Sequence, residues 1–265
     1  MKTAFKTSNP ALSSKSFGGF VGARAAGANM NDAAGARPDA AAMTIQGAVD
    51  KTAILLAVLI FTAIWPWKLF FDSRNPELLL PWLAIGGIGG FVIGMVTIFK
   101  KTWAPVTAPI YAACEGLVLG SISALFELRY PGIAIKSVAL TFGVLLTLLV
   151  AYRTGALRAT AGFKRGVIAA TGAIVIVYLG SFVLGFFGVN VSFMNSSSPL
   201  SIGISLVIVG VAALNLVLDF DLIEQGAKLG APKYMEWYGA FALLMTLVWL
   251  YLEILRLLAK LNDRR

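Results

Sequence analysis

The sequence predicts an all-α membrane protein, a bundle of seven transmembrane helices. Its 265 residues are 58% hydrophobic and only 13% charged, whereas soluble domains carry about 25% charged residues. The mean hydropathy is +0.81. Seven apolar segments are each long enough to cross a hydrocarbon core of about 30 Å at about 1.5 Å per helical residue. We therefore expect a multi-pass membrane protein.

Residues 1–50 differ in composition from the rest of the chain. They are rich in Ala, Gly, Ser and Asn and show no apolar periodicity, which predicts a disordered tail. They also lack the apolar core of about 7–15 residues that a signal peptide needs. We expect a seven-helix transmembrane domain over residues 51–262 and a short basic end at residues 263–265.

The seven predicted membrane segments share a length of about 20 residues and a low content of charge. They are Thr52–Phe71, Leu79–Phe99, Val106–Phe126, Ile133–Tyr152, Gly166–Gly188, Ser201–Leu218 and Tyr238–Leu258. Lys and Arg are more frequent in the short connections on the side of the N-terminal tail. This asymmetry favours a cytoplasmic N-terminus in the cell membrane, inner or plasma. The basic C-terminus would then lie outside, unless the last two segments do not both cross.

Several function classes are excluded by what the sequence lacks. The net charge of +9 comes from basic residues spread over tails and loops, so it indicates membrane topology rather than nucleic-acid binding. The chain has no histidine and one cysteine, Cys114, so common zinc and haem ligand sets are missing. No phosphate-binding glycine loop or nucleophile elbow is present. We expect no cofactor and no enzyme; an intramembrane enzyme is the weakest alternative, because a GxGD pattern is missing.

Small residues predict which helices pack closely. Gly86, Gly90 and Gly94 recur at every fourth position of the second segment, and Gly116 and Gly120 do so in the third. In lipid, such spacing allows two backbones to approach closely. This pattern indicates helix packing and no ligand.

Carboxylates inside the apolar segments are the candidate functional residues. An ionisable group at membrane depth is costly unless it is paired or hydrated, so it usually faces the bundle interior. Glu115 falls near the middle of the third segment, with Tyr111 one turn away as a hydrogen-bond donor. Asp219 and Asp221 close the sixth segment and point to different faces of a helix. For Asp219 and Glu115 we favour a functional interpretation.

Other acids have a simpler interpretation. Asp221 and Glu224 fit a solvated helix end. Glu253 and Arg256 have the spacing of an intrahelical ion pair at the interface. If Asp219 met a second acid, the two could share one proton. Protonated, the pair would hold helices together; ionised, it would repel and bind a cation. Asp219 and Glu115 are therefore candidate transient cation ligands, and the resemblance described next implies that this cation is calcium.

The closing part of the chain resembles a known family. The run LVLDFDLIEQG, then YMEWYGAF and a last helix ending LEILRLL, resembles the Bax inhibitor (transmembrane Bax inhibitor motif) family, and SNPAL and EGLVLG resemble its prokaryotic branch. The likeness covers roughly residues 45–262. It implies a seven-helix fold with six helices around a central C-terminal helix. Characterised relatives are associated with pH-sensitive calcium leak, and a bacterial one with modulation of a membrane-bound AAA protease.

By this resemblance, the family's acid on the sixth helix falls on Asp219, and Asp221 takes the place of a polar Gln. The family's second acid, on the seventh helix, falls by register on Thr246, which is a departure from the pattern. Glu253, two turns further along the same face, or Glu115 would then have to act as the partner. Both choices stay open at this point.

The sequence therefore supports two hypotheses from different classes. The first is a pH-sensitive calcium or cation leak pathway gated by Asp219, with Glu115 or Glu253 as the second acid. The second is a non-conducting membrane regulator that binds a partner such as a membrane-bound AAA protease through its tail or loops. The lipid bilayer is the partner common to both.

Overall fold

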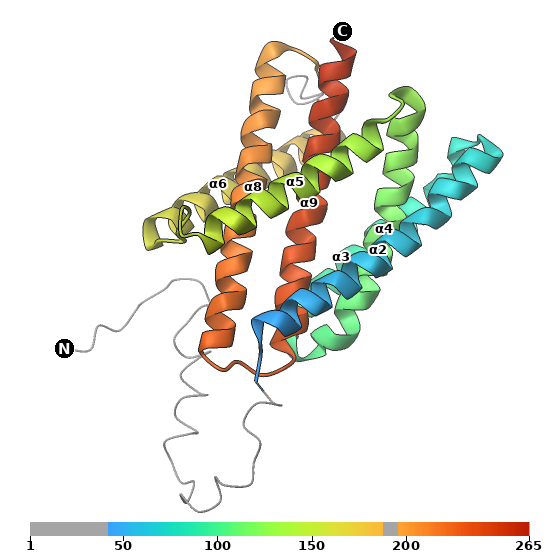
Figure 1. Ribbon diagram of the computed structural model, residues 1–265. Helices are drawn as coiled ribbons and strands as arrows, with labels where there is room; N and C mark the ends of the chain where they lie inside the picture. The colour runs from blue at the N-terminus through green and yellow to red at the C-terminus, as the bar shows by residue number, and fades with distance from the viewer. Residues whose placement is uncertain (1–41, 188–195, 265) are drawn as a thin grey trace, which may run out of the picture. The chain divides into compact units, whose positions relative to one another are not determined.

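A computed structural model describes residues 42–187 and 196–264, and this part of the chain is built from helices (Figure 1). The long helices are α2 (Ile45–Ser73), α3 (Leu80–Phe99), α4 (Ala104–Arg129), α5 (Ile133–Arg153), α6 (Ala161–Phe186), α8 (Pro199–Lys228) and α9 (Met235–Asp263). Two short 3₁₀ helices, η2 (Pro76–Leu79) and η3 (Lys101–Trp103), precede α3 and α4. All seven long helices are long and apolar enough to cross a membrane. The seven predicted segments are confirmed.

The first helix begins earlier than the sequence suggests. Most of the predicted tail, residues 1–41, lies outside the described residues, but residues 45–50 form the start of α2. Thr44 is the reason, because its hydroxyl accepts a hydrogen bond from Gly47 N at 2.9 Å and so caps the helix. Its amide and hydroxyl also donate to Glu236 Oε1, at 3.0 and 2.9 Å. The start of α2 is thereby tied to the start of α9.

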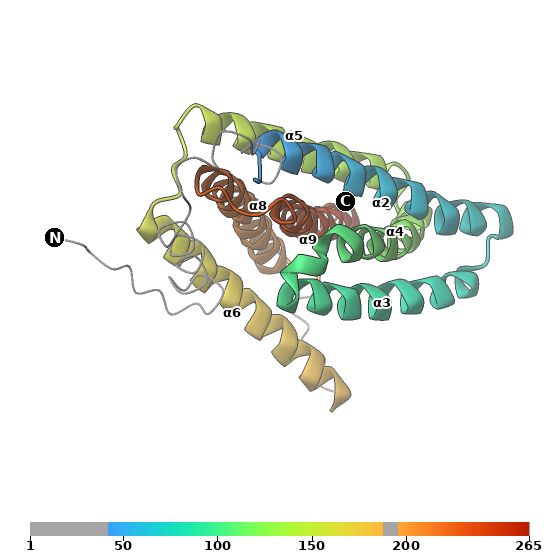
Figure 2. The same cartoon turned by 90° about the horizontal axis from the view of Figure 1, so that it is seen from below.

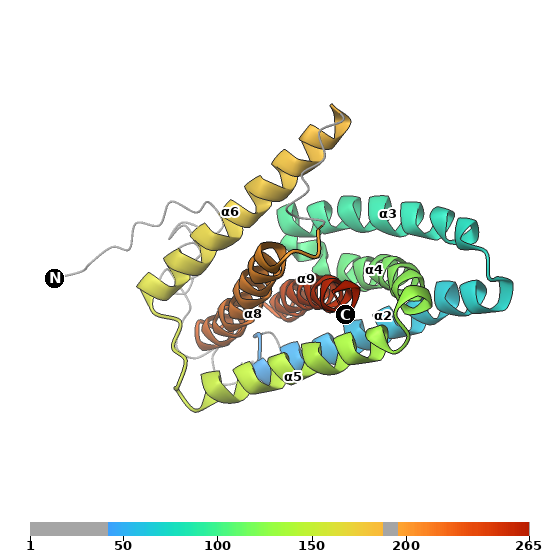
Figure 3. The same cartoon turned by 90° about the horizontal axis from the view of Figure 1, so that it is seen from above.

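Helix α9 lies at the centre of the bundle, as the views along it show (Figures 2 and 3). It packs against α2, α4, α5 and α8, while α3 packs on α4, and α6 packs on α8. Within its apolar window, 56% of the residues are buried inside the protein, against 6% for the peripheral α6. The predicted arrangement, with six helices around the C-terminal one, is confirmed.

Buried glycines set the spacing of α2, α3 and α4. A Cβ atom on Gly116 would lie 1.9 Å from Thr62 Oγ1 of α2, and one on Gly120 would lie 2.2 Å from Ala63 O. On α3, a Cβ on Gly86 would lie 2.7 Å from the Cys114 carbonyl oxygen of α4. The predicted close packing at these glycines is confirmed, and α4 is held between its two neighbours by backbone contact.

Helix α8 is longer than the expected segment, which ended at Leu218. It continues to Lys228 and ends before Gly230, whose φ of 65° an L side chain rarely adopts. Side-chain hydrogen bonds at i, i+4 spacing stabilise this polar extension. They run from Gln225 to Asp221 and from Lys228 to Glu224. Asp219 therefore lies inside a continuous helix and not at its end.

Candidate functional site

Asp219 faces the central helix. The hydroxyl of Thr246 on α9 approaches its carboxylate as a hydrogen-bond donor, and the same hydroxyl also reaches Ala242 O at 3.2 Å. A hydroxyl has one proton, so it cannot satisfy both acceptors at once. Asp219 Oδ2 is buried and has no hydrogen-bond partner among the described residues. An acid in a membrane-spanning helix is thus left with incomplete hydrogen bonding.

Asp221 points away from Asp219, as expected for residues two apart on a helix. Its carboxylate forms an ion pair with Lys164 of α6 and accepts a hydrogen bond from Gln225. Glu224, one turn further on, accepts from Tyr152 of α5 and pairs with Lys228. Both acids are half-buried rather than fully solvated. Their role in the fold is to join α5 and α6 to α8.

Glu115 lies at a different interface, between α3 and α4. The hydroxyl of Tyr111, one turn away, approaches its carboxylate as the expected hydrogen-bond donor. A Cβ built on Gly90 of α3 would lie 3.1 Å from Glu115 Oε1, so the carboxylate occupies the space that this glycine leaves. The ring of Tyr111 packs edge-on against Phe241 of α9, with centroids 4.9 Å apart. Tyr111 therefore connects Glu115 to the central helix.

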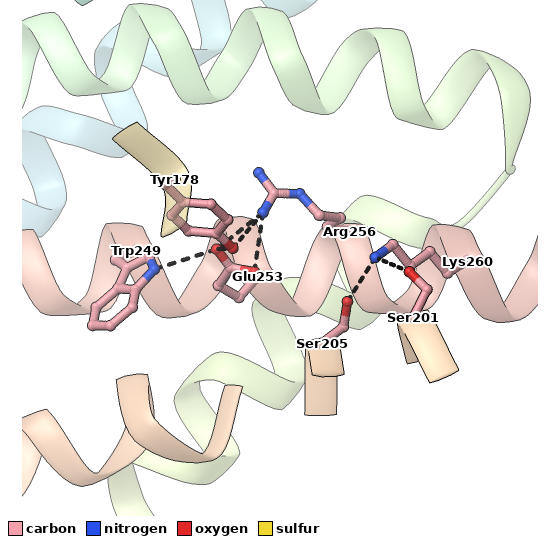
Figure 4. Close-up of polar contacts among 7 residues, drawn as sticks. All are labelled: Tyr178, Ser201, Ser205, Trp249, Glu253, Arg256 and Lys260. Carbon is pink, nitrogen blue, oxygen red and sulfur yellow. Dashed lines mark hydrogen bonds and ion pairs between the residues drawn. The ribbon is translucent and has the colours of Figure 1, made fainter. Parts of the chain in front are cut away.

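Glu253 forms the centre of a polar cluster in α9 (Figure 4). Its side chain is 3% exposed and pairs with Arg256 Nη1 at 3.1 Å, so the predicted ion pair is confirmed. Tyr178 OH of α6 donates to Glu253 Oε1 at 2.7 Å, and Trp249 Nε1 does so at 3.3 Å. The negative charge of the Glu253 carboxylate is thus balanced by Arg256, and the carboxylate accepts hydrogen bonds from Tyr178 and Trp249.

The structure brings some of the sequence-predicted residues together and keeps others apart. Thr246 lies opposite Asp219, as the register on the family pattern placed it. Among the described residues, no hydrogen bond joins Asp219 to Glu115 or to Glu253, whose partners are Tyr111 and Arg256. The neighbour of Asp219 is a hydroxyl where the family pattern has an acid.

Three polar residues that the sequence reading did not single out are built into the bundle. They are Tyr178, Glu236 and Lys260, and the last two are buried. Lys260 had a signal in the sequence, because Glu253, Arg256 and Lys260 are spaced by three and four residues and form a charged stripe on an apolar helix. Glu236 had none, since its partner Thr44 is distant in the sequence.

The described part of the chain also holds an apolar groove between α2, α4, α5 and α9. Its volume is about 400 Å³, and its walls are almost entirely hydrocarbon, from residues such as Leu59, Val138 and Leu247. Ser123 and Tyr251 also line it, and their hydroxyls bond each other at 2.7 Å. Because it offers no charged group, this groove is not a cation site.

These features define a class: a multi-pass helical membrane protein with a buried central helix that carries polar groups on several faces. A family model described as Bax inhibitor 1 like matches residues 9–263, nearly the whole chain. The chain belongs to this family. No curated protein and no solved structure matches it.

Proposed function

We propose that the protein is a pH-sensitive leak pathway for calcium or another cation in the cell membrane, with its N-terminus in the cytoplasm. The observation that carries the proposal is the Asp219 carboxyl group between α8 and α9, one oxygen of which is buried and has no partner among the described residues. An ionised carboxylate in such a place is costly unless a cation or water reaches it. Asp219 is therefore the acid on which proton binding and cation binding would compete.

The state of Asp219 decides how α8 packs on α9. When protonated, the carboxyl group is neutral and can both donate and accept hydrogen bonds, so the two helices stay packed around Thr246. When ionised, it loses its proton donor and attracts a cation or water, which separates the helices. Glu115, whose partner is also a hydroxyl, supplies a second oxygen on the far side of α4. A cation in transit would meet the two carboxylates one after the other.

Calcium flux into dye-loaded liposomes tests this mechanism. We expect the purified protein to conduct more calcium at about pH 8 than at about pH 6, because ionised Asp219 opens the path. Asp219→Asn keeps the side-chain volume but stays neutral, so its flux should be low and independent of pH. Asp221→Asn is the matched control and should keep the pH dependence, since Asp221 is paired with Lys164.

A second candidate is a non-conducting regulator that binds a membrane-bound AAA protease. The observation that favours it is that four other helix-borne acids pair with cations: Glu253 with Arg256, Asp221 with Lys164, Glu224 with Lys228 and Glu236 with Lys233. Such pairs hold helices in place and leave few free charges for an ion path. The same flux experiment separates the candidates, because a regulator conducts no calcium at any pH.

A further inference from the structure

A polar cleft lies between the ends of α4 and α9, away from Asp219. Its volume is about 420 Å³. The polar residues that line it are three cations, Arg129, Arg256 and Lys260, one acid, Asp263, and Tyr130. These residues lie in the last turns of α4 and α9 or directly after them, where a membrane helix meets the lipid headgroups. The cleft is therefore basic and close to a membrane surface.

Two of the cations are already neutralised. Arg256 pairs with Glu253 at 3.1 Å, and Arg129 pairs with Asp263 at 3.3 Å. Tyr130 also donates a hydrogen bond to Asp263 and accepts one from Arg129 Nε at 2.8 Å. Each of these guanidinium groups keeps N–H donors beyond those pairs, because arginine has five. Lys260 is thus the cation of the cleft whose positive charge is not neutralised by an ion pair within the described residues.

Lys260 is buried at 7% exposure, and no acid pairs with it in the described chain. Its Nζ donates to Ser201 Oγ and Ser205 Oγ of α8, both at 2.8 Å (Figure 4). An ammonium group has three donors, and two neutral hydroxyls do not balance its charge. Arg256 is near enough to repel it, and Glu253, which is already paired with Arg256, is near enough to attract it. Burial of a cation in these conditions is costly unless an anion comes close.

The neighbouring helix end increases the need for an anion. Ser201 and Ser205 lie in the first two turns of α8, which begins at Pro199. The N-terminus of a helix carries a partial positive charge, so the ammonium group of Lys260 faces a positive helix end as well as Arg256. Phosphate is the anion that helix N-termini and arginine forks bind most readily.

We infer that this cleft binds a phosphate-bearing anion, with Lys260 as the buried cation and Arg129 and Arg256 at its rim. The phosphate can belong to the headgroup of an anionic lipid or be free in solution, and the chemistry of recognition is the same. The site is independent of the proposed cation leak, because Asp219 and Thr246 do not line it.

Binding measurements on the full chain in a neutral detergent test the inference with three probes. These are a short-chain phosphatidylglycerol, inorganic phosphate, and a diacylglycerol with the same acyl chains but no phosphate. We expect phosphatidylglycerol to bind saturably and the diacylglycerol not to bind. Lys260→Met should weaken phosphatidylglycerol binding at least about tenfold, because it removes one charge-assisted contact. If inorganic phosphate shows the same dependence on Lys260, the site accepts phosphate from solution.

Matched variants keep the result interpretable. Lys136→Met removes an exposed lysine at the start of α5 with the same change in net charge, and it should bind like the parent. Arg129→Gln changes a side chain that is 72% exposed, so the fold is preserved, and we expect about threefold weaker binding. It decides the question if Lys260→Met does not fold. Unchanged affinity in a folded Lys260→Met, or in Arg129→Gln, or equal binding of the diacylglycerol, would overturn the inference.

Discussion

Gly116→Ala should destabilise the protein by about 3 kcal/mol, one of the two largest effects that the structure predicts. The added Cβ would lie 1.9 Å from Thr62 Oγ1 and 2.3 Å from Leu59 O. The Thr62 side chain can rotate, but the carbonyl oxygen of Leu59 belongs to the backbone of α2 and moves only with that helix. Because α4 also packs on α3 and α9, it cannot simply shift away. Denaturant unfolding in mixed micelles would measure the loss.

Gly143→Ala is the matched control for this substitution. Gly143 is exposed on α5, and a Cβ built there meets nothing within 4 Å. We expect its free energy of unfolding to stay equal or to rise by less than about 1 kcal/mol, since alanine favours the helix. Equal stability of Gly116→Ala and Gly143→Ala would show that α2 and α4 are not in backbone contact.

Arg256→Met should cost about 3 kcal/mol of stability, because it leaves Glu253 as a buried carboxylate without a counter-charge. Tyr178 and Trp249 would still donate to Glu253, which keeps the loss from being larger. Adding Glu253→Gln to this variant removes the uncompensated charge and keeps an acceptor for both donors. The double variant should therefore recover most of the lost stability in the same unfolding measurement.

The control pair for Arg256 is more exposed than the pair of Arg256 and Glu253. Lys228 and Glu224 form an ion pair at i, i+4 with side chains 70% and 33% exposed, so Lys228→Met should cost no more than about 0.5 kcal/mol. A cost for Arg256→Met as small as this, or a double variant no more stable than the single one, would contradict the burial of Glu253.

The fold could be predicted from sequence because membrane insertion imposes local rules. Segment length and polarity located all seven helices, and glycines at every fourth position located two helix contacts. The limits of the helices were harder to predict. Helix α2 begins after the cap Thr44 and so before the expected Thr52. The sequence did not reveal this start, because the partner of Thr44, Glu236, is distant in the sequence. Helix α8 continues past Leu218 because its polar end is stabilised by side-chain pairs.

The residues of the candidate site could be predicted from the sequence, whereas the residues that contact them from other helices were harder to predict. Helical spacing sufficed to separate Asp219 from Asp221 and to pair Glu253 with Arg256. Which residue faces Asp219 depends on how α8 is set against α9, and periodicity does not fix that register. The resemblance to the family placed Thr246 there, and the structure has the same neighbour. The charged stripe in the sequence includes Lys260, but its hydroxyl partners on α8 needed the structure.

Infrared difference spectroscopy of the protein in lipid membranes tests most directly whether Asp219 exchanges a proton. As the pH falls from about 8 to about 5, we expect a band of a protonated carboxyl group to appear in the parent. This band should be missing from Asp219→Asn and kept in Asp221→Asn. An identical band in the parent and in Asp219→Asn would show that the proton is taken up by another group and that Asp219 is not the switch.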